Sequence, residues 1–103
     1  MLNKFLTYRL AVELYKEVKT YSGAITHNEK DQIERASLSI LLNIAEACGK
    51  PTRKDRSRFL HIAMGSLRET QALLVILENT TLIKLADHLG ALLYKFTLNP
   101  GGC

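Results

Sequence analysis

The feature that most constrains the fold is a run of apolar residues spaced three and four positions apart near the end of the chain. Its members are Leu82, Leu85, Ala86, Leu89, Leu92, Leu93 and Phe96. This spacing places all of them on one face of an α-helix, whereas a β-strand would divide them between two faces. The segment is therefore predicted to be an amphipathic helix that buries this face.

Two further segments show the same helical periodicity. Residues 3–21 carry apolar side chains at three- and four-residue steps, with charged residues between them, and Gly23 follows as a stop signal. Residues 53–78 repeat the pattern, and Thr52 stands where an N-cap is expected. Both segments are predicted to be helices with one buried face.

The remaining helical segment is apolar over more than one face. It starts at Thr26, which with Glu29 has the spacing of a capping box, and Gly49 and Pro51 break the chain after it. Beside its main apolar stripe it carries a second one, made of Leu38, Leu41, Leu42 and Ala45. A helix that is apolar around most of its circumference must be buried on most of it, so the second stripe suggests an interface between subunits.

Four helices joined by short connections predict an all-α fold, an antiparallel up-down-up-down four-helix bundle. The chain has 103 residues, of which 47% are hydrophobic, and this suits a single domain with one core. The bundle is expected to occupy residues 1–98, with residues 99–103 as a disordered tail.

The sequence contains no apolar run long enough to span a bilayer, so no membrane partner is expected. Lys4 and Arg9 interrupt the N-terminal stretch where an export signal would need apolar residues. A cytoplasmic protein is therefore predicted. Cys48 and Cys103 could pair with each other, but in a cytoplasm they are expected to be reduced thiols. The cysteines and histidines show no metal-ligand spacing, so no metal or cofactor is predicted.

The net charge of +4 is confined to one short stretch, residues 50–58. Its basic members are Lys50, Arg53, Lys54, Arg56 and Arg58, against the single acidic residue Asp55. The stretch covers the turn before the third helix and its first turns, where the helix dipole favours anions over cations. This placement suits a phosphate-bearing partner, whereas a solvated loop that adds solubility stays open as the alternative.

Two stretches, residues 32–47 and 58–69, resemble the small four-helix-bundle proteins encoded in intervening sequences of bacterial 23S rRNA genes. The matching positions are Gln32, Arg35, Ala36, Ser39, Ile40, Asn43, Ile44, Ala45, Glu46, Arg58, Phe59, Leu60, Ala63, Gly65, Ser66, Leu67 and Glu69. The chain departs from the family pattern at Leu41, where proline is usual, and at Ala47, where glycine is usual.

The resemblance implies a left-handed bundle, no enzymatic activity, and homopentameric rings that would use the second apolar stripe. A more distantly similar protein is the accessory variability determinant of diversity-generating retroelements, a pentamer with a basic surface. That protein binds nucleic acid and a reverse transcriptase.

A line of polar residues runs along the second helix through its most apolar part. Arg35, Ser39, Asn43 and Glu46 all match the family motif. They could form a ligand or RNA site, or a hydrogen-bond network with Ser66, Glu69 or Arg58 of the third helix. The structural network is the preferred interpretation, because buried polar groups need partners.

The leading functional prediction is a non-catalytic, oligomeric protein that binds nucleic acid, with RNA as the expected ligand, through the basic stretch. Its contacts would be mainly to the phosphate backbone, since no aromatic residues are interleaved with the basic ones. The alternative is a scaffold for a polymerase or another acidic protein. An enzyme is disfavoured, because His61 has no metal-ligand partner at i+4 and His88 has no nucleophile nearby in sequence.

Overall fold

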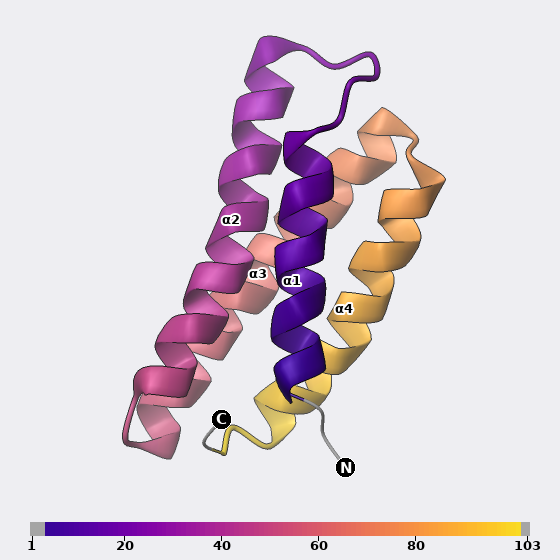
Figure 1. Cartoon of the computed structure of the whole chain (residues 1–103). Helices are drawn as coiled ribbons and strands as arrows, with labels where there is room; N and C mark the ends of the chain where they lie inside the picture. The colour runs from indigo at the N-terminus through magenta and orange to yellow at the C-terminus, as the bar shows by residue number, and fades with distance from the viewer. Residues whose placement is uncertain (1–3, 102–103) are drawn as a thin grey trace.

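The computed structural model describes residues 4–101, and all of its regular structure is helical (Figure 1). The helices are α1 (Lys4–Lys19), α2 (His27–Gly49), α3 (Arg53–Leu77) and α4 (Thr80–Leu98). No strand occurs within the described range, so the prediction of an all-α protein with four helices is confirmed.

The side chains predicted to cap the N-termini of two helices do so. The hydroxyl of Thr26 accepts a 3.1 Å hydrogen bond from the Glu29 backbone N–H, and Glu29 Oε1 accepts a 2.9 Å bond from the Thr26 N–H. The predicted capping box is therefore confirmed. Thr52 caps α3 by accepting a hydrogen bond from the backbone N–H of Asp55.

The helices form a bundle in which each packs on its neighbour in sequence and α4 packs on α1. The most extensive contact joins α2 and α3. On α4, the side chains of Leu82, Ala86, Leu89, Leu93 and Phe96 are buried in the core. The other members of the predicted stripe, Leu85 and Leu92, lie half-buried at its edge. The apolar periodicity of this segment therefore marks the face that fills the core.

The two ends of the bundle are built differently. The start of α1, the α2–α3 turn and the end of α4 lie together at one end, shown at the bottom of Figure 1. The opposite end holds the longer α1–α2 connection and the tight α3–α4 turn. In that turn Glu78 adopts a left-handed backbone conformation, with φ of 56°.

Residues that follow α4 pack against the bundle as far as the structure describes them. Pro100 is buried, and its carbonyl oxygen accepts a hydrogen bond from Arg56. Asn99–Gly101, which belong to the predicted tail, therefore have defined contacts, and residues 102–103 lie outside the described range.

Cys48, near the end of α2, is disulfide-bonded, so the prediction of a reduced thiol is wrong at this position. The other predicted thiol, Cys103, lies outside the described residues. None of the helices within residues 4–101 has the length and apolarity required to cross a membrane.

Candidate nucleic-acid interface

The basic stretch lies where α2 ends and α3 begins. Lys50 caps the C-terminus of α2, and Arg53 is the first residue of α3. The side chains of Arg53, Lys54 and Arg58 are exposed, and none of them forms an ion pair within residues 4–101. Because α3 begins here, the positive end of its dipole adds to these charges. These cations are thus available to an anion from outside the protein.

Arg56 has a different position from its neighbours in the basic stretch. Its half-buried guanidinium donates from Nε to the carbonyl oxygen of Pro100 at 2.6 Å and from Nη1 to that of Lys50 at 3.0 Å. Two of its donors are therefore occupied inside the protein. The sequence assigned Arg56 to nucleic-acid binding, whereas the geometry assigns these donors to holding the C-terminal segment against the α2–α3 turn.

Phe59 brings two of the predicted binding residues together. The Lys50 Nζ lies 5.0 Å from the centre of its ring, and the guanidinium carbon of Arg58 lies 4.7 Å from the same centre. Lys50 also pairs with Glu46, with 3.4 Å between Nζ and Oε2. The charge of Lys50 is therefore partly offset by a carboxylate. Arg58 has no carboxylate partner within residues 4–101, and the aromatic ring positions its guanidinium.

The fold adds charges to this end of the bundle that lie far away in the sequence. Lys4 and Arg9 belong to the first turns of α1, and Lys95 to the last turn of α4, at the same end as the α2–α3 turn (Figure 1). We call this the basic end. Its eight basic residues are Lys4, Arg9, Lys50, Arg53, Lys54, Arg56, Arg58 and Lys95, and its acidic residues are Glu46 and Asp55. The charge segregation is therefore stronger than the sequence stretch alone indicates.

The polar line of α2 is only partly a network between helices. Ser39 Oγ lies 2.8 Å from Ser66 Oγ of α3, and the Asn43 amide donates to the Ser39 carbonyl oxygen at 2.8 Å and to its hydroxyl at 3.1 Å. These half-buried groups match the structural interpretation.

The other residues assigned to this network point elsewhere. Arg35 is exposed and pairs with Asp31 on its own helix at 3.5 Å, as Glu46 does with Lys50. Glu69 is exposed on α3. Among the described residues, the hydrogen bonds of this line therefore join only Ser39, Asn43 and Ser66.

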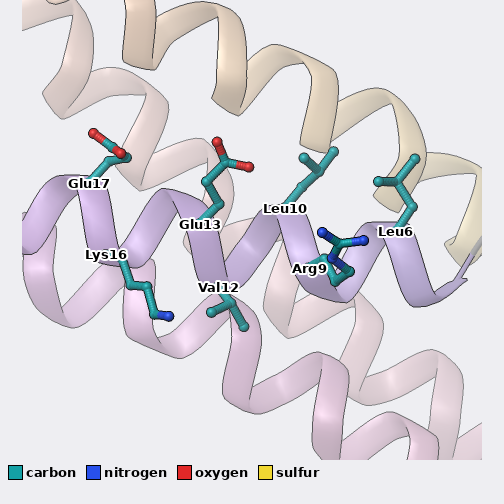
Figure 2. Close-up of a pocket in the computed structure, with 7 residues that line it drawn as sticks. All are labelled: Leu6, Arg9, Leu10, Val12, Glu13, Lys16 and Glu17. Atoms are coloured by element: carbon teal, nitrogen blue, oxygen red, sulfur yellow. The ribbon is translucent and has the colours of Figure 1, made fainter.

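A hollow of about 400 Å³ lies along α1 and is lined by residues of that helix alone. Figure 2 shows Glu13 and Glu17 pointing to one side of the helix, and Val12 and Lys16 to the other. Its charged groups have mixed signs, and no cluster of three metal-ligating side chains occurs anywhere in the described chain. Within residues 4–101 the hollow therefore contains no group of three side chains that could hold a metal ion.

An exposed apolar surface covers the outer side of α1 and α2. Leu42 of the second stripe is 51% exposed, and Phe5 of α1 is 71% exposed. Between the helices lies a groove of about 360 Å³, lined by Lys4, Phe5, Tyr8, Ala45 and Cys48. We call these exposed side chains and this groove the α1–α2 apolar surface. The other members of the stripe, Leu38 and Leu41, are half-buried.

Comparison with known proteins shows a match to one protein family. A family model described as 23S rRNA-intervening sequence protein matches residues 5–95. The match covers nearly all of the four helices, the basic stretch included. No curated protein matches the sequence significantly.

Proposed function

The chain belongs to the family of 23S rRNA-intervening sequence proteins, and on this premise we propose that it is a non-catalytic, oligomeric RNA-binding protein. The family description ties these proteins to rRNA genes, which agrees with an RNA-related role. RNA is the expected polyanion, and DNA would offer the same phosphate chemistry.

One observation carries the proposal: Arg53, Lys54 and Arg58 are exposed at the start of α3 without carboxylate partners in the described chain. Cations at this position oppose the helix dipole by about 0.3–1 kcal/mol each, and a bound phosphate would remove that cost. The surrounding basic end adds long-range attraction. The expected contacts are to phosphates, so affinity would depend on salt more than on base sequence.

The oligomer in this proposal is a homopentamer of left-handed, antiparallel up-down-up-down bundles, joined through the α1–α2 apolar surface. Support comes from Leu42 and Phe5, since large side chains this exposed and adjacent to a groove are typical of protein contacts. An assembly repeats the basic end in every subunit, so weak phosphate sites combine into tighter binding.

The test is a titration of labelled structured RNA with the full chain at several salt concentrations between about 50 and 200 mM. Affinity should fall linearly on a log–log plot as salt rises. The double variant Arg53→Gln/Lys54→Gln should bind more weakly and with a shallower slope, whereas Lys84→Gln should match the unmodified chain. Lys84 is a suitable control because it is an exposed cation on α4 away from the basic end. Absence of binding at about 50 mM salt, or a flat salt dependence, contradicts the proposal.

A second candidate function uses the same apolar surface: a scaffold for a polymerase or another acidic protein. The cations Lys4 and Arg9 beside the exposed Phe5 support it, because they suit an acidic partner that also carries apolar side chains. Purification from native lysate with and without nuclease separates the candidates. A partner that is retained after nuclease treatment favours the scaffold, and loss of all partners favours nucleic acid.

A further inference from the structure

Gly65, in the middle of α3, is not packed closely against the other helices. A Cβ atom built at this position meets no atom of residues 4–101 within 4 Å, whereas at Gly90 of α4 it would meet Leu67 at 3.4 Å. Glycine inside a helix costs about 1 kcal/mol relative to alanine. Close approach of the bundle helices therefore explains Gly90 better than Gly65, where the bare main chain faces open space.

Positively charged side chains flank this open stretch of main chain. Lys54, Arg58, His61, Gly65 and Arg68 follow one another at steps of four, three, four and three residues. Positions with this spacing lie along one face of a helix. All of them are exposed, so they form one outward face of α3. We call this face the α3 strip.

The charges of the α3 strip are not neutralised inside the protein. Lys54, Arg58 and Arg68 form no ion pair within the part of the chain that the structure describes. His61 lies between them, and its Nδ1 donates to the carbonyl oxygen of Ser57 at 2.8 Å. The carboxylate of Glu69, next to Arg68, marks the far end of the strip.

We propose that one strand of nucleic acid runs along the α3 strip, from the basic turn past Gly65 to Arg68, with its phosphodiester backbone against the helix main chain. This inference rests on the proposed function and specifies the path of the bound strand along α3. From Lys54 to Arg68 the strip measures about 21 Å at 1.5 Å per residue. This length is enough for several consecutive phosphates of one strand. The missing side chain at Gly65 lets the strand approach closely between the flanking cations.

The experiment compares four full-length proteins: the unmodified chain, Gly65→Ala, Arg68→Gln and the control Lys84→Gln. Each is titrated into a labelled single-stranded RNA of about 20 nucleotides, and into DNA of the same sequence, at about 50 to 200 mM salt. Arg68→Gln should lower affinity about three- to tenfold at the lowest salt and reduce the log–log salt slope by about 0.7, the value for one phosphate on a single strand. Lys84→Gln should leave both unchanged.

Gly65→Ala is the most discriminating variant. Because its methyl group enters open space and alanine favours the helix, the melting temperature should rise. RNA affinity should nevertheless fall at least threefold, since the methyl group keeps the strand away from the main chain. A merely structural role for Gly65 would not produce a more stable protein that binds less well.

The outcomes separate this inference from the proposed function. If the unmodified chain binds neither RNA nor DNA, the proposed function fails and the α3 strip with it. If it binds with a salt slope while Gly65→Ala and Arg68→Gln bind equally well, only the α3 strip is overturned. A fall in the solution mass of Gly65→Ala, measured by light scattering, would place Gly65 in a contact between copies and would also overturn it.

Discussion

Nε of Arg56 donates a 2.6 Å hydrogen bond to the carbonyl oxygen of Pro100, a residue 44 positions further along the chain. The same guanidinium reaches the carbonyl oxygen of Lys50 at 3.0 Å. One side chain therefore ties the end of α2, the start of α3 and the segment after α4 together. In a stretch otherwise rich in exposed cations, this arginine stabilises the fold that presents the others.

Arg56→Gln should lower the free energy of unfolding by about 1.5–3 kcal/mol, because two half-buried carbonyl oxygens lose a charged donor. Arg53→Gln, which removes an exposed charge without a partner in residues 4–101, should change it by less than about 0.5 kcal/mol. Urea unfolding followed by circular dichroism measures both values. Equal stability of the two variants would show that the contacts of Arg56 contribute nothing to folding.

Ser39 and Ser66 should show energetic coupling, since their hydroxyl oxygens lie 2.8 Å apart between α2 and α3. In a double-mutant cycle, Ser39→Ala and Ser66→Ala together should cost less than the sum of the single changes, by about 0.5–1.5 kcal/mol. The pair Ser39→Ala and Thr97→Ala serves as the control, because Thr97 bonds locally on α4. Additive effects in the first pair would rule out the bond across the helices.

Leu42→Glu should separate the proposed oligomer into single chains of 11.6 kDa while leaving the helix content unchanged. A charge on this half-exposed position makes burial between subunits unfavourable but is tolerated by an isolated bundle. Val75→Glu is the matched control, because Val75 is 63% exposed on α3, away from the α1–α2 apolar surface. Light scattering measures the masses. A single-chain mass for the unmodified protein would contradict the proposed assembly itself.

Glu78→Gly should raise the free energy of unfolding by about 0.5–1 kcal/mol. Glu78 ends α3 with φ of 56°, a left-handed conformation that is unfavourable for residues with a Cβ and favourable for glycine. Glu78→Ala should give no such gain, since alanine keeps the Cβ. Thermal unfolding of the two variants distinguishes a backbone effect from the loss of a negative charge, which both share.

Local patterns in the sequence predicted local structure well. The capping box of Thr26 and Glu29 depends on residues three apart, and the buried face of α4 depends only on helical spacing. Both were confirmed because the relevant partners lie within one or two turns. The start of α3 after Thr52 follows from the same local rule.

Interactions between distant residues were not predictable in the same way. Arg56 looked equivalent to Arg53 because its acceptor on Pro100 lies in a segment with no pattern of its own. Lys4 joins the basic end only through the packing of α1 against its neighbours.

The polar line of α2 shows why a shared motif does not ensure a shared network. Ser39 is short and lies against α3, so it reaches Ser66. Arg35 and Glu46 are long and each finds an opposite charge four residues away on the exposed side of the chain. The length of each side chain and the presence of a nearby partner decided which residues meet. The spacing of the polar residues in the sequence does not show which partner each side chain reaches.

The charge segregation along the bundle has a kinetic consequence. With eight cations and two carboxylates at the basic end, the molecule carries a permanent electric dipole along its long axis. In the field of a polyanion this dipole turns the molecule before contact, so most encounters begin with the basic end in front. Added salt would therefore slow capture as well as weaken the phosphate contacts of the bound state.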